Sequence, residues 1–335
     1  MHSEKVISAF KALGKQLSEM KVDAKSKLFT DCNNSNPWFT HESMEVALSG
    51  IIKMLSEDIM SWVKSYDFLS SKRANVGVVF AGNIPAVGFH DLLCVLTSGN
   101  HLVAKLSDKD TCLMRFIMDQ LIDIESELKE RITIVNKLEN IDAVIATGSD
   151  NTARYFEYYF KKYPHVIRKN RTSVGILSGG ENEKDFAELG KDVFLYFGLG
   201  CRNVSKLYVP DGYDFTKILS EFEGYHQLIH HHKYRNNYDY NKSIYLVNKE
   251  PHLDNGVVLF KQDQSLVSPI SVVYYNFYSS DDELERHLLS DQNKIQCIVS
   301  KEGKWPESIP FGRAQYPGLA DYADGVDTLQ FLSNL

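Results

Sequence analysis

The pattern of apolar and polar residues changes along the chain, from helical spacing near the N-terminus to short apolar runs further on. The helical spacing predicts helices over 6–17 and 44–63, with the polar stretch 31–37 as a loop between them. Short apolar runs then predict strands at 76–81, 102–106, 132–135 and 143–146. Helices are expected among them, at 89–96, 111–129 and 151–162. Strands that alternate with helices indicate βαβ units and a parallel sheet.

The second half of the chain continues in the same manner. Strands are expected at 173–177, 206–210, 243–247, 271–275 and 295–299. A helix is expected between the last two of these strands, at 281–289. The pattern therefore predicts an α/β protein with two successive α/β halves and a short C-terminal tail.

Composition narrows the classes of partner. A formal net charge of −7 gives no electrostatic reason to expect nucleic acid or an anionic membrane. The N-terminal residues form no uninterrupted apolar stretch, so no signal peptide is expected, and no apolar run is long enough to cross a bilayer. The cysteines are scattered without a CxxC pair, which favours a reducing, cytoplasmic compartment over a disulfide framework or a zinc site.

Cys201 is the candidate nucleophile. Gly198 and Gly200 precede it, and glycines permit a tight turn that leaves a thiol open to a substrate. Arg202 follows, and a nearby cation favours the thiolate, which is the form that attacks a carbonyl carbon. The alternative is a small apolar residue in a buried loop, the usual role of a free cysteine.

Polar residues at the ends of predicted strands are the other candidates. Asn83 follows a strand directly and could donate a hydrogen bond to a developing oxyanion, although Asn-X-Pro after a strand is commonly only a turn. Lys105 ends the next strand, and Gly148 and Ser149 open a helix whose backbone N–H groups could hold a phosphate. The chain has no GxGxxG fingerprint, so no ordinary Rossmann phosphate loop is expected.

Four histidines stand close together, at 226, 230, 231 and 232. His226 and His230 have the i, i+4 spacing of metal ligands on a helix. No carboxylate or cysteine accompanies them in a recognisable motif, so a solvated or interface surface is favoured and no metal is expected.

Read in order, these segments resemble the aldehyde dehydrogenase superfamily, and most closely its acyl-CoA reductase branch, the LuxC-like fatty acid reductases of bacteria. The segment 82–85 is similar to the family's Trp-Asn-X-Pro, and 101–107 to its strand that ends in Lys-Pro-Ser. Residues 146–149, followed by Arg154, are similar to its Phe-Thr-Gly-Ser segment. The segment 198–209 resembles the nucleophile loop and the strand after it.

The resemblance continues to about residue 320. Leu177-Ser178-Gly179-Gly180 is taken to stand where the family has Glu-Leu-Gly-Gly, so that Leu177 would replace the glutamate that activates water in the hydrolytic members. The segment 265–269 is taken to replace the Glu-X-Phe-Gly-Pro that holds the nicotinamide ribose, and 310–312 is similar to a C-terminal Pro-Phe-Gly-Gly. A thiol site without a water-activating base is expected to release its acyl group to a thiol or a hydride.

The resemblance implies an aldehyde dehydrogenase-like fold with two α/β domains. A Rossmann-like nucleotide-binding domain with a helical lead-in is expected over 1–172, a catalytic thiol domain over 173–312 and a tail over 313–335. The implied catalytic residues are Cys201 and Asn83. The implied cofactor-binding residues are Lys105, Asp108, Thr147, Gly148, Ser149 and Gly179.

The implied activity is reduction of an acyl thioester to the aldehyde, with acyl-CoA or an acyl-carrier protein as the donor. NADPH is favoured and NADH is the alternative, because Asp108 stands where the family often has a ribose-binding glutamate but is shorter and is followed by Lys109. An aldehyde dehydrogenase acting in the oxidative direction and a non-redox acyl carrier or transferase on Cys201 stay open. So do a homo-oligomer and an acyl-supplying partner enzyme.

Overall fold

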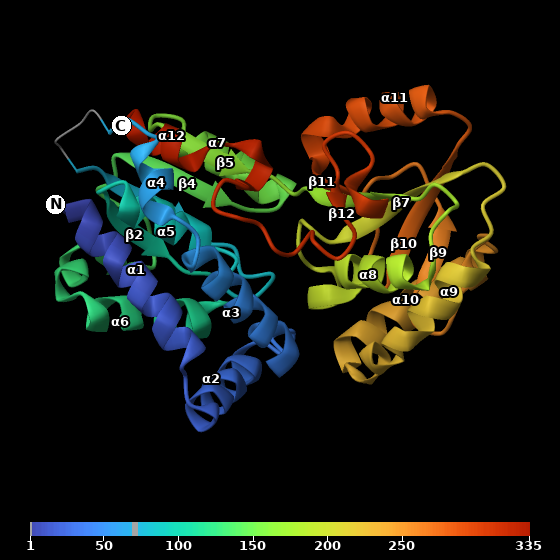
Figure 1. Cartoon of the computed structure of the whole chain (residues 1–335), viewed down its shortest axis with the longest axis horizontal. Helices are drawn as coiled ribbons and strands as arrows, with labels where there is room; N and C mark the ends of the chain where they lie inside the picture. Colours follow the sequence, from blue (N-terminus) through green and yellow to red (C-terminus); the bar gives the residue numbers. More distant parts are fainter. Residues whose placement is uncertain (1, 69–72) are drawn as a thin grey trace. The chain divides into compact units, whose positions relative to one another are not determined.

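The chain folds as two compact units, each built on its own sheet (Figure 1). The computed structural model describes residues 2–68 and 73–335. The first unit comprises Met1–Asn170 and Pro317–Leu335, and the second comprises Arg171–Tyr316. Both units place helices on the two faces of a parallel or mostly parallel sheet, which confirms the predicted α/β class. The domain boundaries expected at 172/173 and 312/313 stay predictions.

The sheet of the first unit has five parallel strands in the order β3-β2-β1-β4-β5. The strands are β1 (Asn75–Val79), β2 (His101–Lys105), β3 (Ile132–Ile134), β4 (Ala143–Thr147) and β5 (His165–Arg168). The chain runs outward from β1 through β2 to β3, and then returns to add β4 on the other side of β1. This reversal creates a topological switch point between β1 and β4, where ligands of open α/β sheets bind at the carboxyl ends of the strands.

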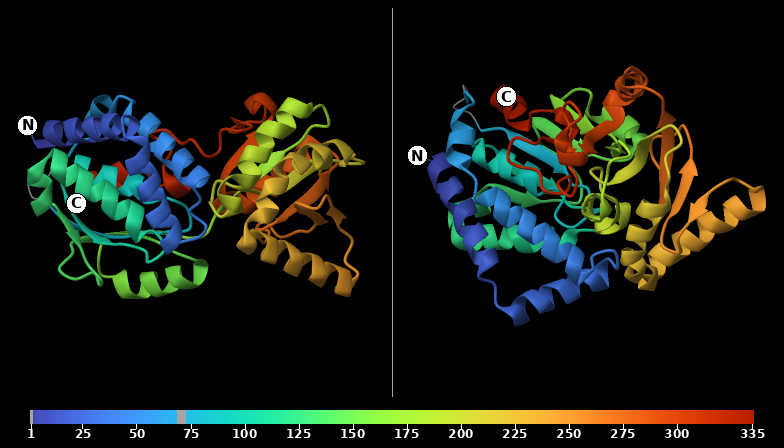
Figure 2. Two further views of the ribbon diagram at one scale, coloured as in Figure 1. Left: turned by 90° about the horizontal axis from the view of Figure 1, so that it is seen from below. Right: turned by 45° about the vertical axis from the view of Figure 1, so that its right-hand side comes forward.

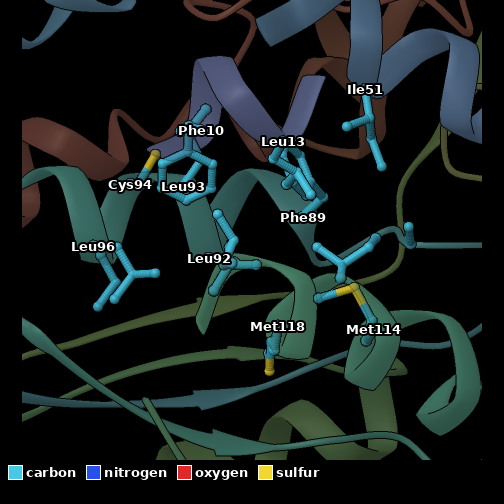
Figure 3. Close-up of a cluster of buried hydrophobic side chains, with 14 of the residues drawn as sticks. Phe10, Leu13, Ile51, Phe89, Leu92, Leu93, Cys94, Leu96, Met114 and Met118 are labelled. Carbon is cyan, nitrogen blue, oxygen red and sulfur yellow. The ribbon is translucent and has the colours of Figure 1, made fainter. Parts of the chain in front are cut away.

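Helices cover both faces of this sheet (Figure 2). One face packs against a large apolar cluster, part of which is drawn in Figure 3, where Phe10 and Leu13 of α1 meet Phe89 and Leu92 of α5. Phe156 packs on the opposite face. The helices of the unit are α1 (His2–Ser18), α2 (Val22–Ser35), α3 (His41–Leu55), α4 (Ile59–Lys64), α5 (Phe89–Thr97), α6 (Thr111–Ile124), α7 (Asp150–Phe160) and α12 (Thr328–Ser333), with 3-10 turns η1 (Ser126–Glu130) and η6 (Ala323–Gly325).

The C-terminal segment is part of the core of the first unit. Leu329 and Leu332 of α12 are buried in the same apolar cluster as α5. Arg168 at the end of β5 pairs with Asp91 of α5 at 2.6 Å and donates to the Thr328 hydroxyl at 2.9 Å. This buried ion pair therefore joins β5, α5 and α12, although α12 is distant from both in sequence.

The sheet of the second unit has the strand order β12-β11-β6-β7-β10-β9-β8, with β8 as an antiparallel edge strand. Helices α8 and α9 pack on one face of the sheet and α11 on the other. The strands are β6 (Thr172–Ile176), β7 (Val204–Pro210), β8 (Leu253–Asp254), β9 (Leu259–Gln262), β10 (Val272–Tyr278), β11 (Ile295–Ser300) and β12 (Ile309–Pro310). The helices are α8 (Glu183–Phe194), α9 (Thr216–Phe222), α10 (His232–Asn248) and α11 (Asp281–Asp291), with 3-10 turns η2 (Leu195–Gly198), η3 (Glu223–His230), η4 (Gln292–Lys294) and η5 (Lys301–Gly303).

Two of the expected elements were wrong. The run 243–247 was expected to be a strand, but it lies in α10, where Tyr234, Tyr238 and Tyr245 are buried at helical spacing while Leu246 and Val247 are exposed. The apolar run was too short to distinguish the periodicity of a helix from that of a strand, whereas the spacing of the buried tyrosines over a longer stretch indicates a helix. The stretch 31–37 was expected to be a loop, yet α2 continues to Ser35 because Phe29 and Cys32 are buried on one face.

Candidate active site

Three adjacent strands of the first unit bring candidate residues to one edge of the sheet. Lys105 is the last residue of β2, Thr147 is the last residue of β4, and Asn83 lies four positions beyond the end of β1. Val79 pairs with Lys105 on one side and with Ala146 on the other, so these strand ends are level. The edge lies at the switch point of the sheet, where the positions predicted for a dinucleotide are expected.

A buried aspartate ties the Asn83 loop to the loop after β2. The backbone N–H of Ala86 donates to Asp110 Oδ2 at 2.7 Å. Burial raises the pKa of Asp110 to about 7, against the opposing effect of the Ala86 and Met114 backbone N–H groups. The two loops are in close contact, since a Cβ added to Gly82 would lie 2.6 Å from Ser107 Oγ. Asn83 therefore sits in a loop whose position is fixed by tertiary contacts.

The N-terminus of α7, which is the positive end of the helix dipole, lies at the same edge of the sheet. Ser149 is the N-cap, because its hydroxyl accepts the Thr152 N–H at 3.3 Å. The Gly148 N–H is taken by the Arg168 carbonyl at 3.2 Å, so Gly148 does not offer this group to a phosphate. The Lys105 side chain and the positive end of the α7 dipole both suit a phosphate-bearing ligand. Asp108 and Lys109, in the loop after β2, are exposed. This edge therefore fits a dinucleotide in its chemistry, with Gly148 shaping the turn.

Cys201 lies in a tight turn before β7 and is partly exposed. The Asn203 N–H donates to the Gly200 carbonyl at 3.0 Å, and the Gly200 N–H donates to Asn203 Oδ1 at 2.8 Å. The Ser173 hydroxyl at the start of β6 donates to the Cys201 carbonyl at 3.1 Å. These bonds hold the backbone on both sides of the cysteine.

The backbone before this turn adopts a left-handed conformation at three successive residues. The φ angles of Tyr196, Phe197 and Gly198 are 53°, 58° and 77°. Glycine tolerates such angles, whereas an aromatic residue there is strained and persists only where its surroundings hold it. Phe197 is buried and packs against His231 with ring centroids 4.4 Å apart. The strain is therefore stored directly before the candidate nucleophile.

Asp192 of α8 connects the turn region to the segment 310–314. Its two carboxylate oxygens accept the Gly312 N–H at 2.6 Å and the Ala314 N–H at 3.0 Å. Burial raises the pKa of Asp192 to about 7, although both N–H groups act in the opposite direction. Arg202 Nη1 donates to the Ala314 carbonyl at 3.4 Å. The expected Pro-Phe-Gly segment is thus joined to the residues around Cys201.

Gly179 and Leu177 do not lie with Cys201. Strands β6 and β7 are parallel neighbours, with Ser173 opposite Val204 at one end and the Leu177 N–H bonded to the Tyr208 carbonyl at the other. Val204 and Tyr208 are separated by about 13 Å of extended chain. Leu177 is fully buried at the edge opposite to the cysteine. Leu177 therefore does not stand where a base would act on Cys201, contrary to the expectation. Gly179, two residues further on, does not lie near Cys201 either.

The histidines are held by aromatic contacts. His226 and His230 have ring centroids 5.9 Å apart, and His231 Nδ1 accepts the Tyr234 N–H as the N-cap of α10. Within residues 2–68 and 73–335, no group of three or more His, Cys, Asp or Glu side chains is arranged to hold a metal ion.

The sequence did not reveal the residues that hold the candidate site together. Asp110, Asp192, Ser173 and Asn203 act through contacts with residues that are distant or that lie across a turn. Nothing in their local sequence marks them, since Asn, Asp and Ser are frequent in turns and helix caps. A buried polar side chain becomes recognisable only when its partners are known.

Comparisons with known proteins agree on family and fold. Residues 42–223 match the family model for acyl-CoA reductase (LuxC). No curated protein shows a significant sequence match. Among solved structures, the NAD+ complex of an aldehyde dehydrogenase from Bacillus cereus is similar at a TM-score of 0.62 and 12% identity, over 90% of this chain and 72% of that chain. An NADP-dependent enzyme from E. coli is similar at a TM-score of 0.66 and 9% identity, over 90% and 73%.

A further match is a mutant of aldehyde dehydrogenase C from Pseudomonas syringae in complex with NAD+ and octanal, at a TM-score of 0.62 and 11% identity over 90% and 73%. At such identities these likenesses show the fold alone. No helix in the described part of the chain is long and apolar enough to span a membrane. The family match supports an oxidoreductase that acts on acyl groups. The family model covers more than half of the chain, including Asn83, Lys105 and Cys201, and the chain belongs to the LuxC family of acyl-CoA reductases.

Proposed function

We propose that this protein reduces an acyl thioester, either acyl-CoA or an acyl-carrier protein, to the aldehyde through an acyl group bound to Cys201. The observation that carries the proposal is the Cys201 turn, a partly exposed thiol with fixed flanking peptides, in a chain of the acyl-CoA reductase family. A nucleophile held in a defined backbone geometry is what covalent catalysis requires.

In the first half-reaction the Cys201 thiolate attacks the thioester carbonyl carbon. The carbonyl electron pair moves to oxygen, and the Asn83 carboxamide and the Cys201 backbone N–H donate hydrogen bonds to this oxyanion. When the carbonyl re-forms, the bond to the departing thiol breaks and the acyl group stays on the Cys201 sulfur. The free thiol of coenzyme A or of the carrier protein leaves.

The second half-reaction returns the cysteine to its starting state. A bound nicotinamide cofactor supplies the hydride that reduces the acyl group. The Cys201 sulfur then leaves as the thiolate, and the aldehyde is released as the carbonyl forms. Lys105 and the residues at the start of α7 are the groups proposed to hold the phosphates, with Thr147 beside them. Gly179 is left out because it lies at the other edge of its sheet from Cys201.

The cofactor is proposed to be NADPH, with NADH as the alternative. Asp108 and Lys109 are both exposed in the loop after β2, so a ribose phosphate would meet a cation beside the carboxylate. Replacing Asp108 by alanine should improve NADPH over NADH by removing the repulsion between the carboxylate and the phosphate. The ratio of kcat/KM for the two cofactors measures this preference, and an unchanged ratio would remove Asp108 from the cofactor site.

The test is cofactor oxidation with acyl-CoA substrates of graded chain length. Cys201→Ala is run in parallel, with Cys112→Ala as a control because Cys112 is also partly exposed but lies in the first unit. We expect aldehyde formation that Cys201→Ala abolishes and Cys112→Ala retains. Acyl label on Cys201 without oxidation would favour an acyl carrier instead. Oxidation of aldehyde without thioester reduction would favour a dehydrogenase, and near wild-type activity of Cys201→Ala would overturn the assignment.

A further inference from the structure

We propose that Asn203 is a positioning residue that fixes the direction of the peptide planes around Cys201. The inference rests on the proposed role of Cys201 as nucleophile. Asn203 is 2% exposed, and its side chain bonds backbone groups at Gly200 and at the end of α8. Its Oδ1 accepts the Gly200 N–H at 2.8 Å. Its Nδ2 donates to the carbonyls of Asp192, Val193 and Leu195 at 3.0, 3.3 and 2.8 Å.

The first consequence concerns the end of α8. The last carbonyls of a helix have no partner within the helix. Nδ2 of Asn203 supplies hydrogen bonds to carbonyls at and just beyond this end, where the chain turns into the left-handed stretch at Tyr196 and Phe197. Asn203 therefore holds the start of the strained segment, while the packing of Phe197 on His231 holds its middle.

The second consequence concerns the peptide between Gly200 and Cys201. A trans peptide is planar, so its N–H points away from its own carbonyl. The Gly200 carbonyl accepts the backbone N–H of Asn203 at 3.0 Å, and the Gly200 N–H donates to the Asn203 side chain at 2.8 Å. The backbone and the side chain of Asn203 therefore hold Gly200 on both sides, and with it the direction of the Cys201 N–H, the proposed oxyanion donor. A donor that is oriented before the reaction needs no reorganisation in the transition state.

The peptide after Cys201 is fixed independently. Its carbonyl accepts the Ser173 hydroxyl at 3.1 Å, and Ser173 lies on β6 rather than in the turn. Both peptide planes that flank the cysteine are thus anchored, one by Asn203 and the other by Ser173. Asn203→Ala keeps the backbone bond to the Gly200 carbonyl and removes the side-chain bonds to the Gly200 N–H and to the end of α8, so fewer bonds hold the turn before Cys201.

The experiment compares Asn203→Ala and Asn203→Asp with a matched control in the full chain. Asn203→Asp keeps an acceptor for the Gly200 N–H and replaces the donor by an oxygen that faces three carbonyls. Asn255→Ala is the control, because Asn255 in the same unit also bonds several backbone groups: the Leu219 carbonyl at 2.9 Å and the Val257 and Val258 N–H groups at 3.0 Å. Folded fraction is measured by circular dichroism and thermal unfolding for each variant.

The readouts are the rate of Cys201 acylation by acyl-CoA and the pH profile of Cys201 alkylation by iodoacetamide, followed by peptide mapping. For Asn203→Ala we expect acylation to fall roughly 10- to 100-fold per folded molecule, with KM for NADPH within about twofold. Asn255→Ala should lower the unfolding temperature and keep both Cys201 rates. Acylation of folded Asn203→Ala at the wild-type rate, with an unchanged pH profile, would overturn the inference.

Two further outcomes keep the inference separate from the proposed function. If neither Asn203 variant folds, Ser173→Ala removes the hydrogen bond to the Cys201 carbonyl instead. An unchanged acylation rate in Ser173→Ala would count against the inference that fixed peptides beside Cys201 are needed. If wild-type Cys201 is not acylated at all, the proposed function fails. The alkylation profile then still decides whether Asn203 controls the exposure and reactivity of the thiol.

Discussion

In each of the two regions that carry candidate chemistry, a buried aspartate accepts backbone N–H groups of a nearby loop, but the number of bonds differs. At the strand ends of the first unit, buried Asp110 holds the Asn83 loop through one oxygen, Oδ2, while Oδ1 is buried without a hydrogen-bond partner in the described part of the chain. At the Cys201 region of the second unit, buried Asp192 uses both oxygens, on the Gly312 and Ala314 N–H groups. The backbone is left-handed in both regions, at Ala86 alone in the Asn83 loop and at three successive residues, Tyr196, Phe197 and Gly198, before Cys201.

The difference indicates how tightly each region must be held. A loop that follows directly from a strand end is positioned by the sheet, so one buried side-chain hydrogen bond is enough to hold it. The cysteine turn precedes its strand and follows three successive left-handed residues, against one left-handed residue in the Asn83 loop, so several hydrogen bonds together hold it. We therefore expect the Cys201 region to be more sensitive to the loss of a buried polar group than the Asn83 loop.

The largest expected effect is on the pH dependence of stability. Asp110 and Asp192 each have a pKa of about 7 in the folded protein and near 3.8 when unfolded. A raised pKa means that the folded state binds the proton more tightly, so this stabilisation is fully present below about pH 4 and is lost as pH rises through about 7. The difference corresponds to at most roughly 4 kcal/mol for each group. Urea unfolding between pH 4 and 8 measures it, with the two Asp→Asn variants as controls that should flatten the decline.

The second expected effect separates the two aspartates at pH 6, where both are largely protonated. Asp192→Asn should lower the free energy of unfolding by about 2 kcal/mol, because its new NH2 group must face one of two N–H donors. Asp110→Asn should lower it by less than about 1 kcal/mol, because the one oxygen of the new side chain can take over the Ala86 N–H from Oδ2 and the NH2 group then stands where the unpartnered oxygen was. Equal losses of unfolding free energy in the two variants, measured by urea unfolding, would contradict the proposed difference between the two aspartates.

A third effect contrasts a glycine required by space with one required by conformation. A Cβ at Gly82 would lie 2.6 Å from Ser107 Oγ, so Gly82→Ala should separate the two loops and destabilise the first unit by about 2 kcal/mol. Gly198 has a φ of 77° and a Cβ would meet nothing closer than 3.6 Å, so Gly198→Ala should lose about 1 kcal/mol. Cofactor binding, measured by titration with NADPH, should weaken only in Gly82→Ala. Weaker binding in Gly198→Ala alone would contradict the assignment of the cofactor site to the first unit.

The smallest effect concerns charge at the strand ends of the first unit. Lys105→Met should raise the Kd for NADPH about tenfold, equivalent to about 1.4 kcal/mol, through loss of one charged contact to a phosphate. Lys109→Met, four positions further and exposed, should weaken NADPH less and leave NADH unchanged. Fluorescence titration of both cofactors at two salt concentrations measures this, and no response in Lys105→Met would remove this lysine from the cofactor site.

Much of the fold could be predicted from local patterns. The apolar runs at β1, β2, β4, β6, β7, β10 and β11 were assigned as strands because a parallel strand is buried on both faces and reads as a continuous apolar run. The short run 165–168 that forms β5, with only Val166 and Arg168 buried, carried no such signal. The tyrosines of α10 misled the pattern because aromatic residues favour strands in isolation.

By itself the sequence determined the class of fold, Cys201 as the candidate nucleophile, and the strand ends that carry Asn83, Lys105 and Thr147, because each of these depends on a contiguous stretch of residues. Only the tertiary structure decided what holds the site. Asp110 meets Ala86 across 24 positions and Asp192 meets Gly312 across 120, and neither pairing has a local signature. It also separated Leu177 from Cys201, because the direction of two parallel strands, and not distance along the chain, sets which residues share an edge.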